Sequence, residues 1–206
     1  MVREIRVYVE GGGNNNTSRR RVRGGFSSFL NPLRKLARQK RLGWTVIVCG
    51  PRPEAFESFK MAARSHPEAF NVLLVDSEAP VSRPPWEHLQ QQVGWTRPES
   101  VRETQGHLMV QTVEAWIVAD PETLSDFYGQ GFLRNALPGS EDVEVIPKDR
   151  LLSSLNHATR GTQKGPYHKI DHGAALLERI DPERVRSRSQ HCDRMFRELE
   201  AVIREA

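Results

Sequence analysis

The amino-acid sequence predicts an α/β protein built on a mainly parallel sheet that is flanked by helices. Three apolar segments, at residues 2–9, 44–50 and 70–80, have the length and composition of buried strands. Two stretches between them, 26–43 and 52–69, repeat their apolar residues at helical spacing. This alternation of strands and helices predicts parallel strands that are joined by right-handed crossovers.

The first predicted strand ends at an acidic residue and leads into a polar segment. Apolar residues recur along residues 2–9, and Glu10 follows them directly. Three glycines and three asparagines come next, and we expect the arginine-rich residues 17–25 to continue this loop. The following amphipathic stretch, 26–43, predicts a helix in which Pro32 marks the first turn.

The rest of the chain predicts one more strand and several helices. Residues 80–106 read as a loop with one short helix, and 108–111 as a strand. A helix then runs through Glu114 and Trp116, and Asp120, which a proline follows, is a favoured N-cap for the next helix. An irregular stretch at 129–146 precedes the remaining predicted helices, which are 147–159, 169–180 and 182–206.

The composition is typical of a folded protein and excludes a disordered or disulfide-stapled one. Of 206 residues, 37% are hydrophobic and 27% are charged.

We expect an α/β core at 1–146 and a helical C-terminal segment at 147–206 that packs on it. The net charge of +4 mildly favours an anionic partner, and two cysteines form no disulfide framework. No apolar run approaches the roughly 18 residues of a membrane span, and no signal peptide precedes the first strand, so we expect a cytoplasmic protein.

Acidic residues stand at the carboxyl ends of two predicted strands. Glu10 follows the first strand, while Asp76 and Glu78 lie at the end of the third. Ligands bind at this edge of open parallel sheets, and converging carboxylates repel one another unless a cation lies between them. Such oxygen ligands suit Mg²⁺ or Mn²⁺ better than zinc, and Glu114 is a candidate ligand for a second metal. The alternative is that each acid is solvated or caps the next helix.

The glycines after the first strand and the arginines beyond them are candidates for phosphate binding. Glycine brings backbone N–H groups close to an anion, and arginine supplies positive charge. No Gly-Lys-Ser/Thr follows, so the segment is not a P-loop, and a flexible linker with a solvated basic stretch explains it equally well. The candidate residues are Gly11, Gly12, Gly13, Arg19, Arg20 and Arg21.

Four motifs together resemble a known family. They are VYVEGGG, LLVDSEAP, HLMVQTVEAWIVADPETLSDFYG and KGPYHKIDHGAALL, and they occur in the order seen in the bacterial domain-of-unknown-function family numbered 4276. That family looks like the Toprim domain of topoisomerases and bacterial primases, and it is more distantly similar to the overcoming-lysogenization-defect nucleases. The resemblance implies a Toprim-like, Rossmann-like sheet.

The resemblance also implies roles for individual acids. Glu10 matches the glutamate of the Toprim motif, and Asp76 with Glu78 matches its Asp-x-Asp pair. A glutamate stands at the second position of that pair, where topoisomerases have aspartate, and its side chain reaches further toward a metal. Glu114 resembles an additional acid of the two-metal nucleases.

The activity that the resemblance implies is metal-dependent hydrolysis of phosphodiester bonds in DNA or RNA. Two cations roughly 4 Å apart would be Mg²⁺ or Mn²⁺, and either Lys164 or Lys169 would offset charge on the phosphate. Such a nuclease would be the effector of a bacterial phage-defence module. The alternatives are a regulatory or toxin subunit that acts only with an ABC/AAA-type ATPase, and a metal-free binding domain. The apolar stripes of the last helix either pack on the protein's own sheet or dock that partner.

Overall fold

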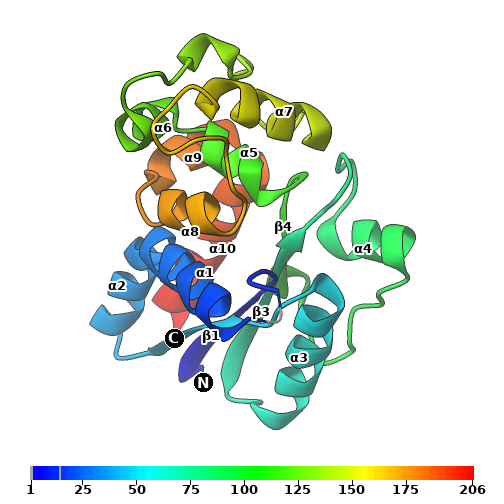
Figure 1. Cartoon of the computed structure of the whole chain (residues 1–206). Coiled ribbons are helices and arrows are strands. Elements are labelled where there is room, and N and C mark those ends of the chain that lie inside the picture. Colours follow the sequence, from blue (N-terminus) through cyan, green and yellow to red (C-terminus); the bar gives the residue numbers. More distant parts are fainter. Residues whose placement is uncertain (1, 14) are drawn as a thin grey trace.

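The protein is built around a sheet in which all strands are parallel (Figure 1). The computed structural model describes residues 2–13 and 15–206. The predicted α/β fold class is confirmed. Strand order in the sheet is β2-β1-β3-β4, so β1 and β3 are central neighbours. The strands are β1 (Glu4–Val9), β2 (Gly43–Val48), β3 (Ala69–Asp76) and β4 (Gly106–Met109).

Helices connect the strands and continue after the last one. None of the described helices is long and apolar enough to cross a membrane. Two short 3-10 turns, η1 (Glu103–Gln105) and η2 (Arg134–Ala136), lie in the connections. The helices are α1 (Asn16–Phe29), α2 (Asn31–Gln39), α3 (Arg52–Ser65), α4 (Pro85–Val93), α5 (Val113–Val118), α6 (Pro121–Tyr128), α7 (Lys148–Thr159), α8 (Asp171–Leu177), α9 (Pro182–Arg188) and α10 (Gln190–Glu205).

Alternation along each strand builds a separate core on each face of the sheet. In β1, Val7 and Val9 belong to one buried cluster and Tyr8 to the other. The Tyr8 side is covered by α3 and α4, and the opposite side by α1, α2 and α10, as Figure 1 shows in outline. Both faces are therefore closed by helices, which explains the nearly continuous apolar sequence of the central strand β3.

The last helix packs against the protein's own core. Four of its apolar residues are fully buried in the larger of the two clusters, so the interpretation of this stripe as cis packing is confirmed. Phe196 of α10 meets the ring of Phe29 edge-on at 5.8 Å, and Phe29 stacks on Trp116 at 5.0 Å. These contacts join α1, α5 and α10. The buried residues of the stripe are Met195, Phe196, Leu199 and Ile203.

The prediction of a loop at the arginine-rich residues 17–25 is wrong, because these residues belong to helix α1. The side chain of Asn15 caps the helix by accepting a hydrogen bond from the Thr17 amide at 2.8 Å. Glycine at position 25 lets α1 approach α8 closely, since a Cβ there would lie 2.8 Å from the Ala174 carbonyl oxygen. Packing against α8 therefore outweighs the low helix propensity of this glycine.

Two predicted helices are each divided in the structure. The stretch 26–43 contains the end of α1 and the whole of α2, which has Pro32 in its first turn. The stretch 182–206 divides at Ser189, whose hydroxyl caps α10 by accepting from the Cys192 amide at 3.2 Å. The predicted strand at 108–111 begins and ends two residues earlier, as β4.

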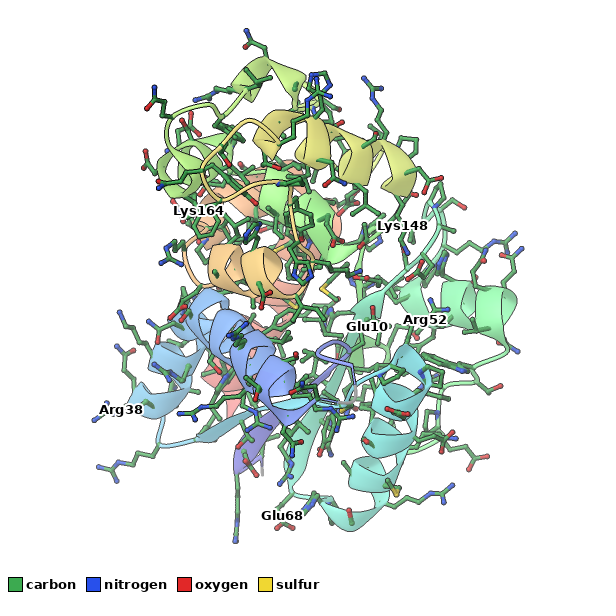
Figure 2. The ribbon with its side chains drawn as sticks, viewed as in Figure 1. Glu10, Arg38, Arg52, Glu68, Lys148 and Lys164 are labelled. Atoms are coloured by element: carbon green, nitrogen blue, oxygen red, sulfur yellow. The ribbon has the colours of Figure 1, made fainter. Side chains whose placement is uncertain are left out.

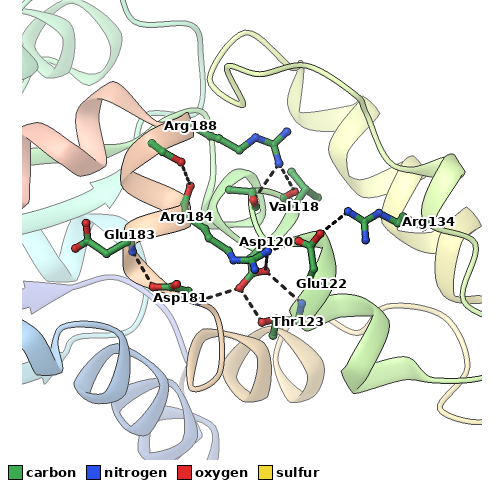
Figure 3. Close-up of polar contacts among 11 residues, drawn as sticks. Val118, Asp120, Glu122, Thr123, Arg134, Asp181, Glu183, Arg184 and Arg188 are labelled. Carbon is green, nitrogen blue, oxygen red and sulfur yellow. Dashed lines mark hydrogen bonds and ion pairs between the residues drawn. The ribbon is translucent and has the colours of Figure 1, made fainter.

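Asp120 ties the last helices to the rest of the protein (Figure 3). Its carboxylate caps α6 by accepting from the Thr123 amide at 3.2 Å, as predicted. The same carboxylate accepts from the Asp181 amide at 3.0 Å and lies 3.3 Å from the Arg184 guanidinium. Because it is almost fully buried and fully paired, Asp120 has a structural role.

Candidate metal centre

The carboxyl ends of the two central strands bring three acids together. Val9 and Leu74 are register partners in β1 and β3, so Glu10, which follows β1, lies next to the strand end formed by Asp76. Glu78 has a φ of 61°, in the left-handed region that non-glycine residues adopt rarely, and the chain turns there. One oxygen of each of the three carboxylates lies within 4.8 Å of the others. This acid triad is a group that can hold a metal ion.

Asp76 is the buried member of the acid triad, with only 2% of its surface exposed. Its Oδ1 accepts from the Val113 amide at 2.9 Å, and its Oδ2 lies 3.2 Å from the Thr112 hydroxyl oxygen. Burial, and next the neighbouring Glu10 carboxylate, raise the pKa of Asp76 well above its ordinary value. Burial also raises the pKa of Glu10. Two such carboxyls favour either a bound proton or a cation in its place.

Glu114 is fully buried in the first turn of α5 and is satisfied by the protein itself. It accepts hydrogen bonds from the Thr112 hydroxyl and, at 3.2 Å, from the Tyr167 hydroxyl. The ammonium of Lys169 lies 3.7 Å from Glu114 and 3.9 Å from Asp76. Within residues 2–13 and 15–206, Glu114 is not one of the acids that cluster tightly enough to share a metal. The structure thus pairs Glu114 with a lysine.

The structure distinguishes the two candidate lysines. Burial tends to lower the pKa of Lys169, but the surrounding carboxylates, led by Glu114, raise it above its ordinary value. Lys169 is therefore a fixed positive charge beside the acid triad. Lys164 instead holds its ammonium 5.1 Å from the centre of the Phe127 ring, and Figure 2 shows it among the upper helices, away from Glu10.

The glycine loop, residues Gly11–Gly13, borders the acid triad, and Arg19 holds it through a hydrogen bond. All three glycines have positive φ, and a Cβ on Gly12 would lie 2.7 Å from the backbone of Arg19. The Gly11 amide donates to the Gly50 carbonyl at 2.7 Å, and Arg19 Nε donates to the Gly13 carbonyl at 2.7 Å. Arg19 therefore shapes the loop, and its Nε–H is used within the protein.

The other two candidate arginines lie elsewhere on α1. Arg20 and Arg21 are exposed and border a different hollow, between α1 and α8. Arg21 pairs there with Asp171. The three predicted glycines therefore line the cavity at the acid triad, and these two arginines do not.

Three residues that sequence reasoning missed complete the surroundings of the acid triad. Arg52, the first residue of α3, donates to the Asp76 carbonyl at 3.2 Å. Lys148, at the start of α7, pairs with Glu78, and Figure 2 shows Arg52 beside Glu10. The third is Tyr167, which holds Glu114. Only Arg52 carried a usable signal, because it follows the β2 strand end at the same sheet edge.

The acid triad opens into a cavity of about 370 Å³. Its polar end holds the triad with Arg52, Lys169 and the glycine loop. An acid cluster with one buried member, two basic side chains and the glycine backbone at one end of a cavity can bind a divalent cation and an anionic ligand together.

Comparison with known families agrees with the motif resemblance. The sequence model of the family described as "Domain of unknown function (DUF4276)" matches residues 9–200. The chain belongs to this family. The matched range begins just before Glu10 and includes every candidate residue of the site described above, from the glycine loop to Lys169. No solved structure matches the chain.

Proposed function

We propose that this protein hydrolyses phosphodiester bonds in nucleic acid with Mg²⁺ or Mn²⁺ held by Glu10, Asp76 and Glu78. The observation that carries the proposal is the convergence of these three carboxylates within 4.8 Å, beside the fixed charge of Lys169. Structural acids at a strand end are ordinarily solvated or paired with a basic residue. Here burial raises the pKa of two of the three, which favours a positive ligand between them.

The donor set fits a hard divalent cation. All three side chains offer carboxylate oxygen, which suits Mg²⁺ or Mn²⁺, and across residues 2–13 and 15–206 no sulfur or imidazole belongs to this cluster. When bound, such a cation supplies Lewis-acid stabilisation of a phosphoryl oxygen. A cation also removes the repulsion between Glu10 and Asp76, because it replaces the proton that their raised pKa values favour.

The chain's own basic residues would position the phosphate. Lys169 keeps its proton at neutral pH, and the Arg52 guanidinium has N–H groups beyond the one that contacts the Asp76 carbonyl. In the hydrolysis, a water oxygen forms the new bond to phosphorus while the P–O ester bond breaks. The water gives up a proton, the leaving oxygen takes one, and Lys169 and Arg52 stabilise the negative charge on the phosphoryl oxygens.

The proposal is tested by calorimetric titration of Mn²⁺ into the wild-type protein and into Asp76→Asn, followed by cleavage assays on labelled DNA and RNA. The matched control is Glu68→Gln, an equal change of charge at an exposed residue that lies far from Glu10 in Figure 2. We expect Mn²⁺ binding and cleavage in the wild type and the control, and neither in Asp76→Asn.

Two other results would change the conclusion. An absence of Mn²⁺ binding in the wild type would refute the hydrolytic function and leave a metal-free binding domain. Binding of Mn²⁺ without cleavage would favour a subunit that acts only with a partner ATPase. Repeating the cleavage assay with such an ATPase would then decide whether the site is catalytic.

A further inference from the structure

The cavity at the acid triad has a second, apolar end that metal binding does not use. Helices α1 and α8 form its walls on two sides, and residues at the β4–α5 junction complete it. Among the described residues, none that lines this end offers a charged side chain to a phosphate, so it fits an uncharged, largely apolar group. The apolar residues that line it are Val22, Phe26, Met109, Val113, Ile170 and Leu177.

The size of the cavity limits what can enter. A volume of about 370 Å³ is near the lower end of the range of roughly 300–1,000 Å³ for small-molecule sites. One base with its sugar and phosphate fits such a space, and a stacked duplex does not. A base reaches an apolar pocket of this kind only when it is unpaired and unstacked.

The charge distribution favours a polymer over a small phosphorylated molecule. Residues 11–53 contain ten lysines and arginines and no acidic residue, while the rest of the chain contains twenty basic and twenty-six acidic residues. This segment includes α1, which forms one wall of the cavity, and α2, from which Arg38 projects outward in Figure 2. Arg20 and Arg23 are exposed on α1. Exposed basic residues on two successive helices, one of which forms a wall of the cavity, are the electrostatic signature of nucleic-acid binding.

We infer that the cavity receives one unpaired nucleotide of a single-stranded nucleic acid. Its base lies against the apolar end and its phosphate at the acid triad, while the neighbouring backbone crosses the basic surface of α1 and α2. This inference deepens the proposed function, on which it rests for the role of the triad. It adds a substrate class: single strands or unpaired positions, and not continuous duplex.

The test is fluorescence anisotropy with a labelled 20-nucleotide single strand and a duplex of the same sequence, with Ca²⁺ in place of Mg²⁺ or Mn²⁺ so that a cation occupies the acid triad while cleavage is suppressed. We expect the single strand to bind at least tenfold more tightly. Ile170→Trp, which adds a ring at a partly exposed position of the apolar end, should weaken single-strand binding about tenfold. Val145→Trp adds the same ring at an exposed residue outside the cavity and should change nothing.

A second pair of variants tests the basic surface. Replacing Arg20 and Arg23 by glutamine should lower the slope of log affinity against log salt by about 1.4, at roughly 0.7 for each lost phosphate contact on a single strand. Replacing Arg150 and Arg160, two exposed arginines of the α7 region, by glutamine is the matched control and should leave the slope unchanged. Circular dichroism and thermal melting establish that each variant is folded.

The inference and the proposed function fail in different ways. Equal or tighter binding of duplex, no binding of either form, or a folded Ile170→Trp variant with full single-strand affinity would overturn the inference. Mn²⁺ calorimetry on the same preparations reports on the acid triad independently. Single-strand selectivity without Mn²⁺ binding would overturn only the hydrolytic function, and Mn²⁺-dependent cleavage of duplex would overturn only the inference.

Discussion

Asp76→Asn should separate the metal-binding role of the acid triad from its structural role. Asp76 is buried, and its pKa is raised by burial and by Glu10. A carboxyl with a raised pKa is harder to ionise in the folded than in the unfolded protein, where its pKa is about 3.9, so ionised Asp76 lowers the stability of the metal-free protein at neutral pH. Asparagine removes this destabilisation. Its side chain can still accept from the Val113 amide and can donate to the Thr112 hydroxyl.

The size of the metal effect follows from mass action. At 100 times its Kd, Mn²⁺ stabilises the folded wild type by about 2.7 kcal/mol. A chain of 206 residues has an unfolding entropy of about 0.4 kcal/mol per kelvin, so the melting temperature rises by about 6 °C. Asp76→Asn should melt in EDTA at or above the wild-type temperature and show no rise with Mn²⁺. Differential scanning calorimetry at pH 7.5 measures both quantities.

The opposite pattern would refute the reasoning. If Asp76→Asn melts well below the wild type in EDTA, Asp76 stabilises the fold as an ion and its raised pKa is not the controlling feature. If Mn²⁺ raises the melting temperature of the variant as much as that of the wild type, the ion binds elsewhere. Glu68→Gln, at an exposed acid, should behave as the wild type in both conditions.

Three further changes test other parts of the structure. Lys169→Ala should lower cleavage at least a hundredfold, because one preorganised donor to a developing negative charge contributes about that much, while Lys164→Ala should not. Burial lowers the pKa of His107 to about 3, so the folded protein keeps this imidazole neutral while the unfolded chain protonates it below pH 6.5. The free energy of unfolding therefore decreases as pH falls below 6.5. Urea unfolding should show that the free energy of unfolding is about 2 kcal/mol lower at pH 5 than above pH 6.5, and His107→Gln should not show this decrease. Glu144 accepts from the His191 amide at 2.8 Å, and Glu144→Gln should lower the free energy of unfolding by about 1–3 kcal/mol at pH 7.

Each of these changes has a result that would contradict it. Equal loss of cleavage in both lysine variants would place the phosphate away from the acid triad. A His107→Gln protein with the wild-type pH dependence would mean that another group titrates. Burial tends to raise the pKa of Glu144, but hydrogen bonds from His191 and Ser189 lower it. Its contribution is therefore present above the unfolded pKa near 4.3 and decreases as pH falls from there through the lowered folded pKa, so a Glu144→Gln effect that does not change with pH would refute the assignment.

The elements that sequence reasoning predicted correctly are those whose local pattern and tertiary environment agree. Residues 2–9 alternate apolar side chains and β3 has a nearly continuous apolar run, and the sheet buries both patterns, so both central strands were predictable from residues 2–9 and 70–80. The prediction for residues 17–25 was wrong because Gly24, Gly25 and the arginines are typical of a loop. The helix that they form packs against α8, far away in the sequence. Arg21 and its partner Asp171, for example, are 150 residues apart. The spacing of apolar residues within 17–25 carries no information about a contact so distant in the sequence.

The candidate site divides in the same way. Glu10 and Asp76 were predictable because neighbouring parallel strands carry their carboxyl ends to one edge, whatever the loops do. Lys148 and Tyr167 come from segments after the sheet, and nothing in their local sequence places them near the acid triad. The choice between Lys164 and Lys169 was open for the same reason, since it depends on how one loop folds over α5.

The position of Lys169 leads to a prediction about the number of metals. The resemblance to two-metal nucleases implies a second cation at Glu114, yet the Lys169 ammonium lies 3.7 Å from that carboxylate, and Tyr167 and Thr112 donate to it. A second divalent ion would have to displace a lysine whose pKa the same carboxylates raise. We therefore expect one Mn²⁺ per chain in calorimetry. Lys169→Ala, which vacates this position, should retain the first ion and admit a weaker second one. Two ions in the wild type, with the second lost in Glu114→Gln, would show instead that Lys169 moves aside and that both metals belong to the site.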